Sequence, residues 1–200
     1  MHIRTYIAGS ILSCCLLATV ATPASAQNAA PPAAPAKPAA GTPVAPAKVY
    51  GDLLSRLEEE FVSAAEAMPE DKYDFAPPTS IGEYKGVRTF AQQIKHVTEA
   101  NDYFFHDPGQ PLVDFRPDIE KLKTKAEIVK ALKDSFATAH AYVDAITPEN
   151  AFVTLPGGST RAGQASFGIA HFMDHYGQLV EYLRMNGIVP PASEGRRGGM

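Results

Sequence analysis

The chain has 200 residues, and its 18 Lys and Arg against 22 Asp and Glu give a formal net charge of −4 at pH 7. It carries no basic stripe, so nothing in its charge pattern indicates a nucleic-acid partner. Both cysteines, Cys14 and Cys15, lie in an N-terminal segment that we expect to be removed, which would exclude disulfides and thiolate metal ligands from the mature chain.

Residues 1–26 have the pattern of a secretory signal peptide. Arg4 precedes an apolar run at 7–20, and a small-residue cleavage site at 24–26 is followed by Gln27. The apolar run is shorter than the roughly 20 residues that a membrane span needs. We therefore expect a periplasmic or secreted protein whose mature chain has no membrane span.

The rest of the chain divides into a linker, one domain and a tail. Residues 27–48 are almost entirely Ala and Pro, and such a segment buries too little apolar area to offset its chain entropy, so we expect a disordered linker. Residues 49–192 have the length of a single domain with one core. Residues 193–200 hold two arginines among glycines and are predicted to be a disordered tail.

Two helices are predicted in the first half of the domain. The first spans 49–68, where apolar residues recur at helical spacing, and three prolines interrupt the segment that follows. The second spans about 88–105. Its apolar core stripe consists of Phe90, Ile94, Val97 and Phe104. The stripe beside it consists of His96, Ala100 and Tyr103 and so includes a histidine.

Two further helices are predicted in the second half. Thr124 and Glu127 form a capping box at the start of the third helix. The fourth lies within 164–191, where Gly168 would allow a neighbouring helix to approach closely and Gly187 would serve as a left-handed cap before two prolines. The pattern predicts an all-α protein with a four-helix bundle. All three connections are long enough to cross over the bundle, so their lengths leave the order of the helices open.

The fourth helix carries a histidine pair at metal-ligand spacing. His171 and His175 are four residues apart, so their side chains lie on one helix face. His96 adjoins the core stripe of the second helix and is the natural third partner, because facing helices of a bundle converge side chains into metal sites. Three neutral imidazoles suit Zn²⁺, Ni²⁺, Fe²⁺ or Cu²⁺ and leave a position open for water or substrate. Phe172 stands where a zincin requires Glu, so this is not a metalloprotease helix.

Two further polar residues continue the face of the histidine pair. Gln178 and Tyr182 are predicted either to orient a bound water or substrate, or to form hydrogen bonds within the core. Because metal binding requires neutral imidazoles, we expect occupancy to fall as the pH drops through about 6.

Three stretches of the sequence resemble the DinB/YfiT-like superfamily: HFMDHYGQLVEYLRMNGIVPP in the fourth helix, VRTFAQQIKHV in the second, and MPEDKYDFAPP after the first. The resemblance implies a four-helix bundle in which one histidine of the second helix and the pair of the fourth bind a divalent metal. On this resemblance the ligands are His96, His171 and His175. Some members of the superfamily are thiol-dependent transferases or isomerases, and others are described as metal-dependent hydrolases.

We therefore expect an exported DinB-like protein that binds a divalent ion such as zinc, nickel or iron. The first hypothesis is a metal-dependent enzyme of the hydrolase or thiol-transferase type, which acts on a small-molecule substrate that the sequence does not identify. The alternative is a non-catalytic metal-binding or dimerisation bundle, for which a homodimer is one form. An open pocket above the metal would favour the enzyme, and a closed fourth ligand would favour the alternative.

Overall fold

The computed structural model describes residues 39–114 and 116–194. The predicted signal peptide at 1–26 lies outside the described residues, as do residues 27–38 of the predicted linker and 195–200 of the predicted tail. The elements described below all belong to one compact unit that begins at Gly41.

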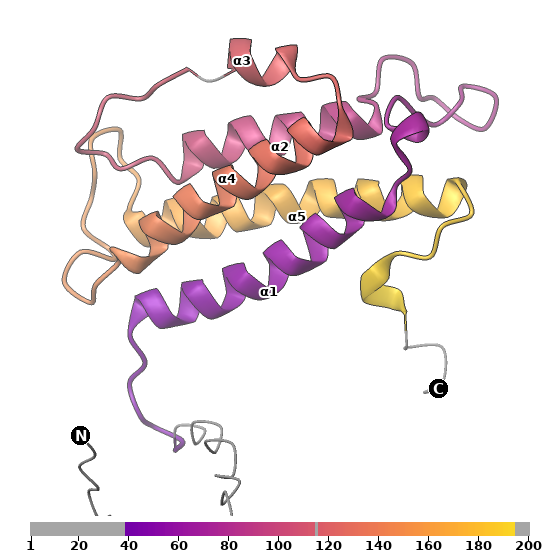
Figure 1. Cartoon of the computed structure of the whole chain (residues 1–200). Helices are drawn as coiled ribbons and strands as arrows, with labels where there is room; N and C mark the ends of the chain where they lie inside the picture. Colours follow the sequence, from indigo (N-terminus) through magenta and orange to yellow (C-terminus); the bar gives the residue numbers. More distant parts are fainter. Residues whose placement is uncertain (1–38, 115, 195–200) are drawn as a thin grey trace, which may run out of the picture. The chain divides into compact units, whose positions relative to one another are not determined.

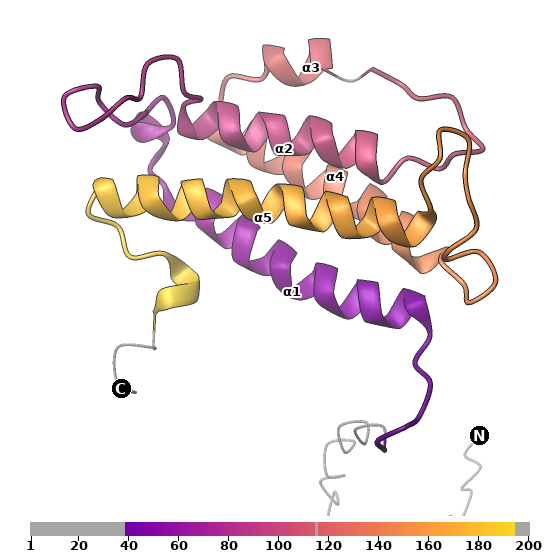
Figure 2. The same ribbon diagram turned by 180° about the vertical axis from the view of Figure 1, so that it is seen from behind.

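The described part of the chain is helical (Figures 1 and 2). The long helices are α1 (Pro46–Ala67), α2 (Phe90–Phe104), α4 (Lys125–Asp144) and α5 (Arg161–Met185). Shorter elements are α3 (Arg116–Lys121) and the 3₁₀ turns η1 (Glu70–Lys72) and η2 (Pro191–Ser193). Within this part of the chain the β pairing consists of one isolated bridge, between Thr154 and Thr160. No described helix combines the length and the apolar character that crossing a membrane requires.

The order of the helices around the bundle follows from their contacts. Both α1 and α2 pack against α4 and α5, so α1 lies across the bundle from α2. α1 and α5 run in one direction, and α2 and α4 run in the opposite direction (Figure 1). Because α2 and α4 are parallel neighbours, the chain between them must return along the length of the bundle. Residues 106–114 and α3 make this return, and we call them the cover segment (Figures 1 and 2).

Local sequence signals fix the helix ends. The predicted capping box at Thr124 is confirmed, since its hydroxyl accepts from the Glu127 amide while the Glu127 carboxylate accepts from the Thr124 amide. The predicted cap at Gly187 is confirmed as well, because it has a φ of +74°. The amide of Ile188 then donates to the carbonyl of Leu183 at 2.9 Å, which closes the last turn of α5.

The core is an aromatic cluster contributed by three helices. Phe61 of α1, Phe136 of α4 and Phe172 of α5 are all fully buried. Their rings meet edge to face, with centroids 5.3 Å apart for Phe136 and Phe172 and 6.2 Å apart for the other two pairs. This geometry is the preferred one for aromatic pairs and fixes the spacing of α1, α4 and α5.

Two features differ from the sequence-based expectation. α1 begins at Pro46, three residues before the predicted start, because proline is well tolerated in the first turn of a helix, where its missing N–H is not needed. α3 lies in the connection between the second and third predicted helices, where the sequence predicted no helix. Its six residues are fewer than two helical turns, too few for an apolar periodicity to become visible.

Gly168 allows α5 to approach α2, as predicted. A Cβ atom built at this position would lie 2.7 Å from Cζ of Phe105 and 3.0 Å from Cβ of Phe104. Both distances are shorter than ordinary van der Waals contact. The end of α2 and the first half of α5 can therefore pack this closely only because position 168 has no side chain.

We expect Gly168→Ala to lower the free energy of unfolding by about 1–3 kcal/mol, as overpacking of a core does. The matched control is Gly177→Ala in the same helix, where the added Cβ would meet no atom within 4 Å. This control should be neutral or stabilising by up to about 1 kcal/mol, because alanine favours the helix. Urea denaturation of both variants measures the difference, and equal effects would contradict the close approach.

Candidate metal centre

The structure brings the three predicted histidines together. His96 extends from α2, and His171 and His175 extend from one face of α5. One ligand nitrogen from each ring can be chosen so that all three lie within 4.8 Å of one another. The centroid of the His96 ring lies 5.1 Å from the centroid of the His171 ring and 4.8 Å from that of the His175 ring. Nitrogens bound to one zinc ion would be about 3–3.5 Å apart, so small rotamer changes would complete a shared site.

Burial keeps these imidazoles neutral. His175 is only 6 % exposed, and His96 and His171 are half-buried. Desolvation, followed by the positive charges of Arg88 and of His171 when it is protonated, lowers the pKa of His96 to about 4. Desolvation likewise lowers the pKa of His175 to about 4, and the pKa of His171 is lowered for the same reason. At neutral pH all three rings are therefore in the form that binds metals.

A chain of hydrogen bonds holds His175 in one orientation. The amide nitrogen of Gln93 donates to Oε1 of Gln178 at 2.6 Å, so the amide oxygen of Gln93 faces His175. His175 Nδ1 lies 2.6 Å from that oxygen and must therefore be the protonated nitrogen. Gln178 in turn donates to Asp174 at 3.3 Å. This chain leaves Nε2 of His175 unprotonated, as a metal ligand requires.

His171 provides a test of whether these residues fit a metal ion. Its Nδ1 atom is buried and has no hydrogen-bond partner among the described residues. Unpartnered buried polar atoms are rare and carry a desolvation cost. His171 packs instead against the ring of Phe104, with centroids 5.2 Å apart. An unsatisfied imidazole in a cluster of three neutral imidazoles fits a divalent ion, which would use the lone pairs that the protein leaves free.

Two clefts reach the histidines. The smaller has a volume of about 410 Å³ and is lined by His96, His171 and the aromatic side chains of Tyr103 and Phe104. The larger has a volume of about 1060 Å³ and a polar lining that includes Arg88, Gln93 and Gln178 as well as His96. Glu99 lines both clefts. Among the described residues the group that could hold a metal ion contains these three histidines and no fourth side chain.

Gln178 and Tyr182 have different surroundings. Gln178 lies in the hydrogen-bonded chain next to His175. Tyr182 is 5 % exposed, and its hydroxyl donates to the carbonyl oxygen of Arg88 at 3.0 Å, so it ties α5 to the start of α2. The structure therefore places both residues in hydrogen bonds between side chains and backbone of the bundle, and a role of Gln178 or Tyr182 in orienting water or substrate stays a prediction.

Sequence reasoning missed Gln93 and Glu99. Gln93 is 2 % exposed, and its position three residues before His96 was the available signal, since such residues share a helix face. Glu99 follows His96 by three residues and was open to the same argument. Burial raises the pKa of the Glu99 carboxyl, and the charge of Glu120 raises it further.

Comparison with known proteins points to one family. The family model described as the DinB superfamily matches residues 53–179, which is more than half of the chain and includes all three histidines. No curated protein matches the chain.

The metal-free protein should lose stability as the pH falls from about 6.5 to about 4. The pKa of His96 and of His175 is about 4 in the folded state and 6.5 in model compounds, so in this window the unfolded chain binds protons that the folded chain does not. The lower end of this window lies well below pH 6, because the folded-state pKa of His96 and of His175 is lower than that of an ordinary histidine. Denaturant unfolding of chelator-treated protein across this range measures the slope. The variant with His96→Gln and His175→Gln should show a smaller slope, and an unchanged slope would contradict the assignment.

Removing the acceptor on Gln93 should weaken metal binding by about 10–100-fold, the usual effect of losing a partner that orients a ligand. Gln93→Met has nearly the same shape but no acceptor, whereas Gln93→Glu keeps one, and the amide of Gln178 can turn to donate to it. Competition with a chromophoric chelator measures both affinities. Equal losses in the two variants would show that Gln93 acts by packing alone.

Proposed function

The chain belongs to the DinB superfamily, and we propose that it is an exported metal-dependent enzyme in which His96, His171 and His175 hold one divalent ion. The observation that carries the proposal is the convergence of three neutral, partly desolvated imidazoles, two of which, those of His96 and His171, line an open cleft. Zinc, nickel and iron all suit three imidazole ligands.

The cleft supports a catalytic use of the site. Structural zinc sites are closed by four protein ligands, whereas catalytic sites keep a position for water or substrate. Here the cluster contains three histidines, and the adjoining cleft of about 410 Å³ is large enough for a small molecule. A divalent ion in such a site supplies Lewis-acid chemistry at the open position.

Glu99 supports a hydrolase more than a thiol transferase. Hydrolysis requires a group that accepts a proton from the attacking water. Glu99 lines the same cleft as His96 and His171, and its raised pKa brings the carboxyl closer to the pH at which proton transfer is efficient. Thiol transfer would instead need a thiol co-substrate, because the predicted mature chain contains no cysteine.

Metal content and turnover of tag-free protein test the proposal together. We expect about one divalent ion per chain, near-complete loss of that ion in His96→Ala, and hydrolysis of an ester or amide substrate that chelation abolishes. Glu99→Gln should retain the ion but lower kcat by about 100-fold. Glu181→Gln, an exposed acid elsewhere on α5, is the matched control and should retain both.

The outcomes separate the two functional classes. Bound metal without turnover on ester, amide or thiol-transfer substrates would favour the non-catalytic binding or dimerisation bundle. Absence of bound metal in protein purified with zinc, nickel or iron present would contradict both. Turnover that requires an added thiol would identify the transferase rather than the hydrolase.

Export is supported by the signal-peptide pattern of residues 1–26. Expression of the full chain in a Gram-negative host, followed by intact-mass measurement of the periplasmic fraction, should give a mature protein that starts at Gln27. Full-length protein confined to the cytoplasm would contradict export.

A further inference from the structure

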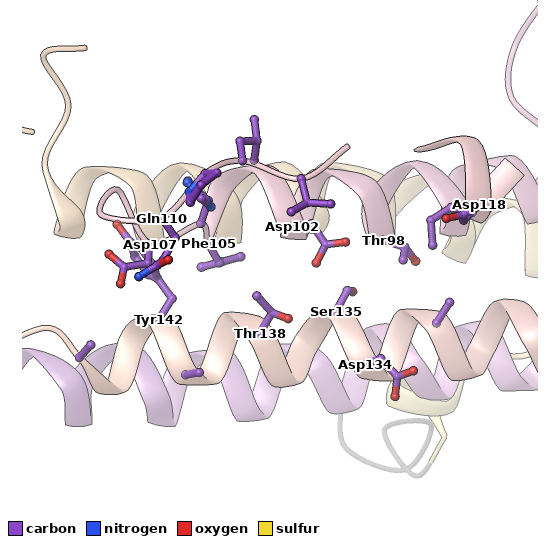
Figure 3. A pocket seen from close by; sticks show the side chains of 18 of the residues that line it. Thr98, Asp102, Phe105, Asp107, Gln110, Asp118, Asp134, Ser135, Thr138 and Tyr142 are labelled. Carbon is purple, nitrogen blue, oxygen red and sulfur yellow. The ribbon is translucent and has the colours of Figure 1, made fainter. Parts of the chain in front are cut away.

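A further cavity lies between α2, α4 and the cover segment (Figure 3). Its volume is about 660 Å³, and ligand pockets range from about 300 to 1,000 Å³. Most of its wall is apolar and includes Phe105, Leu112, Val113 and Ile119. None of the three clustered histidines lines it.

One carboxylate in this cavity has no partner among the residues that the structure describes. Four aspartates line the wall, and three of them bond to a basic side chain: Asp107 to Arg161, Asp118 to Lys121 and Asp134 to Lys130. No hydrogen bond or ion pair joins the fourth, Asp102, to any other residue that the structure describes. Asp102 is half-buried on α2 and points toward α4 (Figure 3).

The protein leaves the charge of Asp102 uncompensated. Desolvation alone raises the pKa of this carboxyl to about 6, and within residues 39–114 and 116–194 no positive charge opposes the shift. A cation that entered the cavity would therefore gain a desolvated ionic partner, the setting in which such pairs are strong.

Two of the other polar side chains that line the cavity, Thr98 and Ser135, offer acceptors to it. The hydroxyl of Thr98 donates to the carbonyl oxygen of Ile94 at 3.0 Å, and that of Ser135 donates to the carbonyl oxygen of Leu132 at 2.8 Å. Both donors are used within their own helices, so the oxygens offer only lone pairs to the cavity. The Ser135 oxygen also accepts from the side-chain amide of Asn101 at 3.1 Å, which leaves it one lone pair. Thr98 extends from α2 and Ser135 from α4, on the two sides of the space that Asp102 enters (Figure 3).

We propose that this cavity binds a small organic cation, a primary ammonium group on an apolar body, with Asp102 as its counter-ion. An ammonium group has three donors and no acceptor, which matches the carboxylate and the hydroxyl oxygens of Thr98 and Ser135. The apolar body would cover the side chains of Leu112 and Ile119. This site does not depend on the function proposed for the histidines.

The cavity adjoins the metal centre. Asp102, Leu112 and Val113 also line the cleft of about 410 Å³ that contains His96 and His171. Because an amine can also bind a metal ion directly, the test must distinguish the aspartate from the histidines.

Calorimetric titration of the full chain with n-hexylamine, hexan-1-ol and hexanoate tests the proposal. We expect saturable binding of hexylamine, and binding of the alcohol weaker by at least about tenfold, because a hydrogen bond to a charged group is worth about 1.5–3 kcal/mol. Asp102→Asn should weaken hexylamine binding by a similar factor. Its melting temperature should stay the same or rise, since the substitution removes an unpaired, partly desolvated charge.

Two controls keep the outcome decisive. Asp134→Asn removes a carboxylate from the same wall, but this one is exposed and already paired with Lys130, so hexylamine affinity should change by less than about twofold. Zinc-loaded and chelator-treated proteins should bind hexylamine equally. Equal affinity for the alcohol, preference for hexanoate, full binding by Asp102→Asn, or dependence on zinc would each overturn the proposal.

Discussion

The close approach of α5 to α2 is the constraint on which the site depends. At Gly168 a Cβ would lie 2.7 Å from the ring of Phe105, so the two helices reach their spacing only where α5 lacks a side chain. His171 follows three residues later, on the same side of α5. The helix spacing thus sets how far His171 and His175 lie from His96, and the ligand geometry is prepared by backbone packing.

Desolvation then selects the chemistry of the side chains that meet there. It lowers the pKa of His96 and His175 to about 4, which favours the neutral ligand form, and it raises the pKa of the Glu99 carboxyl, which favours a proton acceptor near neutral pH. The buried amide of Gln93 fixes the ring of His175 at little cost, because its own polar atoms are paired. One physical effect therefore prepares both parts of the proposed enzyme.

The sequence predicted the features that depend on local signals. Helical spacing identified the four long helices, the capping box located the start of α4, and the i, i+4 pair with His96 identified the cluster. The order of the helices could not be predicted, because every connection is long enough to cross the bundle. The position of Gln93 three residues before His96 was a signal that it shares the histidine's helix face, but the hydrogen bonds of Gln93 and the surroundings of Asp102 depend on which neighbours the tertiary fold places beside them.

X-ray absorption spectroscopy of tag-free, zinc-loaded protein shows whether His96, His171 and His175 share one ion. If they do, we expect a first coordination shell with three imidazole nitrogens at about 2.0–2.1 Å and one oxygen at a similar distance, with fewer imidazoles in His96→Ala. A shell with one imidazole or none in the unsubstituted protein, or a spectrum that His96→Ala leaves unchanged, would rule out a site shared by the three histidines.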